Sequence, residues 1–103
     1  MSRGIVIVFA ESAVNDLEDI LAWYVDQEVP EVGKRLVGEV IAQVERLADF
    51  PESGRIVPEF ELPHLREIIY PPFRIVYRID GVSISIIRVW RGERVLKVPD
   101  GDA

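Results

Sequence analysis

The chain has 103 residues, of which 49% are hydrophobic and 29% are charged. This composition excludes a disordered chain and suits a globular protein with one modest core. The absence of cysteine excludes disulfide and thiolate chemistry, and the net charge of −6 disfavours direct binding of nucleic acid. We therefore expect a single domain over residues 1–103 in the cytoplasm.

The N-terminal apolar run, residues 5–10, predicts a buried strand over residues 5–9 because that segment is β-branched and aromatic. The run is too short to span a membrane, and acidic Glu11 follows it directly. No signal-type cleavage pattern accompanies it. We expect neither membrane association nor export.

Residues 11–28 predict a helix with Ser12 as its N-cap. Its apolar face is formed by Leu17, Ile20, Leu21 and Tyr24. Three acidic residues near its start, Asp16, Glu18 and Asp19, suit the positive end of the helix dipole, and we expect them to be solvated.

Pro30 predicts the start of a second helix, which Pro51 ends. The apolar face of this helix is formed by Leu36, Val37, Val40, Ile41, Val44 and Leu47. Residues 50–55 then predict a turn. Two amphipathic helices with a short connection indicate an antiparallel helical hairpin.

After Pro63 the apolar period changes from 3.6 to 2, which predicts strands over residues 65–70, 73–79 and 82–90. Pro71 and Pro72 predict a loop wider than two residues, and Asp80-Gly81 predicts a two-residue hairpin loop. The expected fold is α+β, in the order β-α-α-β-β-β. The helical hairpin packs on one face of a small, mainly antiparallel twisted sheet.

The Asp80-Gly81 loop would pair Ile79 with Val82 and Ile75 with Ile86. The core face would then contain Phe73, Ile75, Tyr77, Ile79, Val82, Ile84 and Ile86. The opposite, uncovered face would contain Arg74, Val76, Arg78, Ser83, Ser85, Ile87 and Val89. Glu67 would lie opposite Val76 and diagonal to both arginines.

The uncovered face therefore combines Arg74, Arg78 and Glu67 with an apolar strip, and we expect a binding surface there. The strip consists of Ile69, Val76, Ile87 and Val89. Two arginines at the end of the last strand, Arg91 and Arg94, extend the positive stretch. The alternative is a half-solvated sheet with only an Arg–Glu–Arg network between its strands.

Charge is distributed unevenly along the chain. Residues 1–63 contain five Lys/Arg and thirteen Asp/Glu, or −8, whereas residues 64–103 contain seven and five, or +2. One histidine and no cysteine leave no zinc site, and no glycine-rich phosphate loop is present. We expect no metal and no cofactor.

The string HLREIIYPPFRIVYRIDGVSISIIRVWRGER, residues 64–94, resembles the last three strands of the ParE/RelE superfamily of toxins from toxin–antitoxin modules. Earlier residues match the family's helix and turn motifs: Ala13, Asp16, Leu17, Ile20, Tyr24, Pro51, Gly54 and Arg55. The resemblance covers residues 4 to 95. It implies a helical hairpin on a twisted sheet, and a bacterial toxin, often of a plasmid-stabilisation system, neutralised by a small acidic amphipathic antitoxin in a hetero-oligomer.

The superfamily contains ribosome-dependent mRNA endoribonucleases and poisons of DNA gyrase. A nuclease needs a general base, a general acid and cations at its site. The candidates here would be Arg74, Arg91, Arg94 and His64. Arginine does not release a proton at neutral pH, and a lone histidine is more often a surface residue.

The resemblance thus favours a ParE-like gyrase poison that is not an enzyme, because net acidity is no obstacle to binding a protein target. Two alternatives remain: a RelE-type mRNA endoribonuclease, and a degenerate toxin that acts as a non-toxic binding module. The Trp90-Arg91 pair departs from the family pattern of a small hydrophobic residue followed by histidine.

Overall fold

The computed structural model describes residues 4–91, which form two α-helices, a short 3-10 helix and five strands. The helices are α1 (Glu11–Asp26) and α2 (Pro30–Glu45), followed by the 3-10 turn η1 (Arg46–Ala48). The strands are β1 (Val6–Phe9), β2 (Arg55–Ile56), β3 (Leu65–Tyr70), β4 (Phe73–Asp80) and β5 (Ser83–Arg91). Within residues 4–91 no helix is long and apolar enough to cross a membrane.

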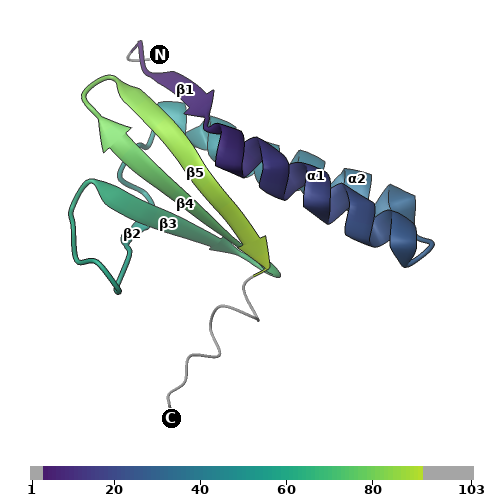
Figure 1. Ribbon diagram of the computed structural model, residues 1–103. Coiled ribbons are helices and arrows are strands. Elements are labelled where there is room, and N and C mark those ends of the chain that lie inside the picture. The colour runs from purple at the N-terminus through teal and green to yellow at the C-terminus, as the bar shows by residue number, and fades with distance from the viewer. Residues whose placement is uncertain (1–3, 92–103) are drawn as a thin grey trace.

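The sheet has the strand order β1-β5-β4-β3-β2, and only the β1–β5 pair is parallel. Figure 1 shows α1 and α2 side by side on one face of this sheet, as predicted. The α+β architecture with a mainly antiparallel sheet is therefore confirmed. The two-residue strand β2 was not predicted, because the segment 50–55 has turn composition and Arg55–Ile56 is too short for a periodic signal.

The core lies between the sheet and the helical hairpin. The expected apolar faces of both helices and the alternating residues of β4 supply it. Its largest fully buried side chains include Tyr77, Phe73 and Leu47. Close packing of the hairpin depends on Gly33, because a Cβ there would lie 2.8 Å from the Cβ of Tyr24.

The start of α1 differs from the prediction. The helix begins at Glu11, and its N-cap is Ala10, whose N–H donates to the carbonyl of Ile86 and so continues the sheet. Ser12 is not the cap, because its hydroxyl donates instead to the carbonyl of Ile87 at 2.6 Å. Pro30 does open α2, as predicted.

Both predicted hairpin loops are wrong in length or position. Tyr70 pairs with Phe73, so the Pro71–Pro72 loop has only two residues, and its peptide bond is cis, as type VI turns require. Asp80 pairs with Ser83, so the second loop is Gly81–Val82 rather than Asp80–Gly81. Gly81 supplies the positive φ at the first loop position, which a type II′ turn needs.

The register of β4 with β5 also contains a bulge between Val76 and Tyr77 that the sequence pattern does not indicate. Tyr77 pairs with Ile86, but Val76 pairs with Arg88, so Ile87 is the additional residue. The bulge reverses the alternation of β5. Val89 consequently packs in the core, 1% exposed, instead of on the outer face, and Val82, expected in the core, is 66% exposed in the loop.

Candidate functional surface

The outer face of the sheet carries a network of charged side chains centred on Glu67. Glu67 lies on β3 opposite Val76, as predicted, and its side chain is fully buried. It accepts hydrogen bonds from Arg55 on β2 and from Arg74 on β4. Arg74 donates a further hydrogen bond of 2.7 Å to Glu59, in the segment between β2 and β3. Two arginines and two glutamates thus neutralise one another.

The buried position of Arg74 contradicts the expected exposure of this residue. Its side chain is 3% exposed. Burial disfavours the charged guanidinium, but hydrogen bonds to Glu59 and Glu67 outweigh this effect and raise the pKa of Arg74. The same hydrogen bond from Arg74 holds the pKa of Glu59 below its ordinary value. Both shifts favour the charged forms of Arg74 and Glu59, so this contact is an ion pair at neutral pH.

Trp90 lies opposite Arg74 across the β4–β5 ladder and is half-buried. Its ring centroid is 5.9 Å from the guanidinium carbon of Arg74 and 5.0 Å from that of Arg88. Both distances are within the range of cation–π attraction. Trp90 therefore contacts both Arg74 of the Glu67 network and Arg88 of β5.

Arg88 joins β5 to helix α1 through Asp16. Its Nε and Nη2 each donate a hydrogen bond of 2.8 Å to one oxygen of the Asp16 carboxylate, and this bond raises the pKa of Arg88. The backbone N–H of Val89 donates to the same carboxylate at 2.8 Å. The expectation that Asp16 is solvated is wrong. Its carboxylate accepts the hydrogen bond of a β5 backbone N–H that lies beyond the end of β1 and so has no partner in that strand.

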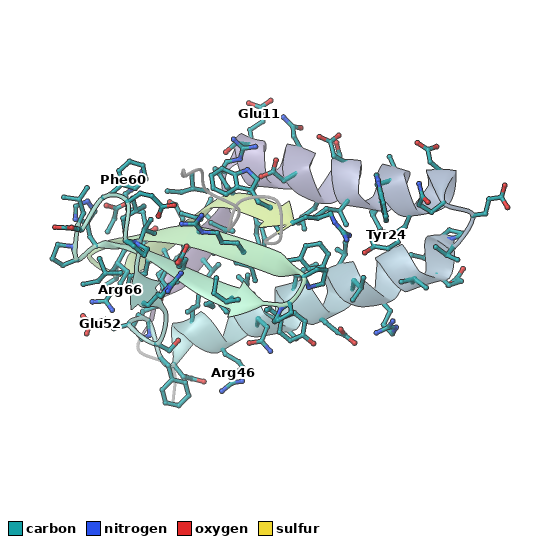
Figure 2. All side chains as sticks on the ribbon, turned by 90° about the horizontal axis from the view of Figure 1, so that it is seen from below. Glu11, Tyr24, Arg46, Glu52, Phe60 and Arg66 are labelled. Carbon is teal, nitrogen blue, oxygen red and sulfur yellow. The ribbon has the colours of Figure 1, made fainter. Side chains whose placement is uncertain are left out.

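The last described residue, Arg91, lies at the end of the helical hairpin. Its Nη1 donates to the hydroxyl of Tyr24 at 2.8 Å, and its guanidinium carbon is 4.7 Å from the ring centroid of Trp23. Trp23 and Tyr24 contact each other edge to face, with centroids 4.8 Å apart. Figure 2 shows Tyr24 between the helices, at the opposite end of the molecule from Glu52, Phe60 and Arg66.

The predicted nuclease candidates do not converge on one site. Arg91 pairs with Phe73 at the start of β4, whereas the carbonyl of His64 accepts from Ile79 near the end of that strand. Six residues of strand separate these two positions by roughly 20 Å. Arg74 is buried and paired with two carboxylates, and Arg94 lies outside the described residues.

The predicted binding strip is interrupted. Ile69 is 40% exposed, and Arg78 is exposed and pairs with Asp80 at 2.8 Å, not with Glu67. Ile87 is half-buried, but Val76 and Val89 are buried, as are Glu67 and Arg74. The apolar strip expected from strict alternation is wrong, because the bulge moves Val89 into the core and Val76 is only 7% exposed.

Four residues of this surface had no predicted role there: Arg55, Glu59, Trp90 and Asp16. One signal was available for Asp16, which falls in phase with the buried residues Ala13, Ile20 and Tyr24 of α1. A carboxylate on an apolar helix face needs a buried partner. Glu59 carries no such signal, because its segment has no periodicity.

The sequence and the fold were compared with known proteins. The family model of the ParE toxin of type II toxin–antitoxin systems, parDE, matches residues 7–96. The chain belongs to this family. The resemblance to ParE/RelE toxins is thereby confirmed, and this ParE-family chain is a toxin of a type II toxin–antitoxin system.

Three relatives were compared with the ParE-family chain. Toxin RelE1 of Caulobacter vibrioides is 29% identical over 90 residues, which cover 84% of this chain and 91% of that protein. A chain of the chromosomal ParDE system from P. aeruginosa matches with a TM-score of 0.73 and 28% identity, over 87% of this chain and 98% of that one. A chain of the toxin–antitoxin complex RelBE2 from Mycobacterium tuberculosis matches with a TM-score of 0.57 and 21% identity, over 84% of this chain and 96% of that one. At this identity the match shows the fold alone.

Proposed function

We propose that this toxin poisons DNA gyrase and is neutralised by a cognate antitoxin. The observation that supports this proposal is that four arginines of the sheet already pair with carboxylates of the same chain. Arg55 and Arg74 pair with Glu67, Arg78 with Asp80, and Arg88 with Asp16. A surface neutralised in this way offers little attraction to a phosphate backbone, whose binding depends on cations that displace counterions.

The alternative of an mRNA endoribonuclease asks for chemistry that the described residues do not assemble. A proton acceptor and a proton donor must lie within hydrogen-bond reach of the same substrate ribose and phosphate. His64 and Arg91 lie near opposite ends of β4. Arg74, the remaining described candidate, has its guanidinium buried against Glu67 and Glu59.

The antitoxin partner is supported by the solved relatives, which come from a ParDE system and a RelBE2 toxin–antitoxin complex. We propose a small, amphipathic and acidic protein that covers the exposed part of the outer face, at Ile69, Arg78 and Ile87. Arg78 is an accessible cation there, with 46% of its side chain exposed. The toxin and its antitoxin would form a hetero-oligomer.

The test uses purified toxin in two assays. One measures supercoiling and cleavage-complex formation by DNA gyrase, and the other measures mRNA cleavage on translating ribosomes. We expect inhibition in the first and intact RNA in the second, both reversed by the antitoxin. Cleavage of mRNA with unaffected gyrase would replace the proposal by the ribonuclease alternative, and inactivity in both assays would favour a non-toxic binding module.

A further inference from the structure

Strand β1 forms one edge of the sheet, and Figure 1 shows it as the outermost strand, beyond β5. The N–H groups of Val6 and Ala10 donate to carbonyls of β5 and of the loop before it, so these residues face β5. The N–H and C=O groups of the residues that alternate with them, Ile5, Ile7 and Phe9, therefore point away from β5. No other strand of residues 4–91 lies along that edge.

The β1 edge lacks the features with which soluble proteins usually protect an open edge, namely charged residues, prolines and bulges. The opposite edge has such a feature, because Arg55 is one of the two residues of β2. Residues 5–10 contain neither a charged residue nor a proline, and the register of β1 with β5 is regular from Val6 to Phe9. Val6 and Val8 are 57% and 46% exposed on the outer face. An apolar open edge of this kind is a template for a further strand.

The open edge is complementary to itself. Antiparallel pairing about a two-fold axis at Ile7, perpendicular to the sheet, brings Ile7 opposite the same residue of a second copy and Ile5 opposite Phe9. These residues all have outward N–H and C=O groups, so each pair exchanges two backbone hydrogen bonds. On the outer face the same register places Val6 opposite Val8 of the second copy, and apolar pairs across strands stabilise a sheet.

We infer that the free toxin forms a homodimer through β1, in which two five-stranded sheets join into one continuous sheet. A second copy is the occupant that this edge specifies, because hydrogen-bonding groups and side chains both match under two-fold symmetry. The inference concerns the toxin without its antitoxin and is independent of whether gyrase is the target.

The size and charge of the contact determine how the dimer behaves. Two four-residue strands bury less than the roughly 800 Å² per partner of a standard interface, so the dimer is weak and depends on concentration. Each copy has a net charge of −6, and this repulsion opposes association. Added salt screens the repulsion but leaves the valine contacts and hydrogen bonds in place, so the affinity should rise with salt.

Sedimentation equilibrium of the purified toxin over a range of concentrations measures the dimer. Val6→Lys should weaken it at least about fivefold, because both symmetry-related valine pairs are lost. Val25→Lys is the matched control, since it adds the same charge at a position of α1 that is also 57% exposed. It should not weaken the dimer. Equal losses in both variants would overturn the inference, and a wild type that stays monomeric would overturn it and leave the edge to a strand of another protein.

A charge exchange tests the register. The double variants Val6→Lys/Val8→Lys and Val6→Glu/Val8→Glu each place like charges opposite one another, so each alone should be monomeric where the wild type is dimeric. In an equimolar mixture every new lysine lies opposite a new glutamate, and a heterodimer should form. Circular dichroism checks that both variants keep the fold, as expected for side chains exposed on the outer face. A mixture of folded variants that stays monomeric would overturn the β1 interface.

Discussion

Asp16 and Arg88 lie 72 residues apart in the sequence and form a two-pronged ion pair that fastens helix α1 to the edge of β5. The pair sits where β1 has ended and β5 continues, so a side chain of α1 takes the place of a neighbouring strand. Ser12, one turn earlier in α1, also replaces a strand partner, because its hydroxyl donates to the carbonyl of Ile87. Sheet and hairpin are thus joined by polar contacts as well as by the core.

The Asp16→Asn variant should unfold more easily than the wild type. Asparagine can still accept from the Val89 N–H but loses the charge-assisted bonds to Arg88, at a cost of about 1–2 kcal/mol. Chemical denaturation measures this difference. Asp19→Asn, three residues along the same helix and exposed, should change the free energy of unfolding by less than about 0.5 kcal/mol. Equal effects of the two variants would contradict the structural role of Asp16.

Removal of Glu67 should be far more damaging than removal of an exposed partner in an ion pair. Glu67→Ala leaves Arg74 buried with only Glu59, and breaking a buried pair in this way costs about 3–5 kcal/mol. Arg78→Ala breaks an exposed pair with Asp80 and should cost less than about 1 kcal/mol. Thermal and urea unfolding of both variants compare the two costs directly.

Arg78→Ala should also separate binding from stability. If Arg78 meets a carboxylate of the antitoxin, its loss should weaken the complex by about 1.5–3 kcal/mol while the fold is retained. Titration calorimetry with the purified antitoxin measures the affinity. Arg66→Ala is a suitable comparison, because its guanidinium is engaged by backbone carbonyls of Pro63, Glu52 and Gly54. Unchanged affinity of the Arg78 variant would remove this residue from the proposed antitoxin surface.

Two glycines should respond in opposite ways to the same substitution. A Cβ at Gly54 would lie 2.6 Å from the carbonyl oxygen of Glu67 and 2.7 Å from the hydroxyl of Tyr77, so Gly54→Ala should be destabilising. A Cβ at Gly38 meets nothing within 4 Å, and Gly38→Ala in α2 should stabilise by about 0.5–1 kcal/mol. Melting temperatures that fall for Gly54→Ala and rise for Gly38→Ala would match this difference in space.

The contact between Glu59 and Arg74 should make stability depend on pH in the acid range. The pKa of Glu59 is lower in the folded state than its ordinary 4.5, so the unfolded chain binds more protons. The stabilisation is therefore complete above pH 4.5 and is lost as the pH falls through the folded pKa. Because Glu59 is half-exposed, we expect the contribution to stay below about 1 kcal/mol.

The matched pair for this measurement is Glu59→Gln and Glu61→Gln, two exposed glutamates of the same segment. Urea unfolding between pH 3 and 6 should show a shallower loss of stability at low pH for the Glu59 variant only. A parallel change in the Glu61 variant would assign the effect to the overall charge of the segment instead.

The sequence pattern was sufficient for the helices and the long strands, because their apolar periods extend over many residues. Tyr77, Val40 and Ile20 are buried where periodicity places them. The bulge at Ile87 and the Gly81–Val82 loop were not predictable in this way, since each shifts the register by local backbone geometry that leaves the composition unchanged. Similarly, strand alternation gives the face of Arg74 but not the segment that covers it, and Glu59 comes from outside the strands.

The parallel pairing of β1 with β5 has a consequence for the synthesis of the toxin. Strand β1 pairs only with residues 83–86 of β5. It therefore cannot join the sheet until the ribosome has translated strands β2 to β4 and the first half of β5. A chain released before residue 83 contains the helical hairpin but leaves β1 unpaired and α1 without its anchor at Val89. Translation products that stop before residue 83 therefore lack both the β1–β5 pair and the contact that anchors α1, so we expect them to lack the toxin's fold.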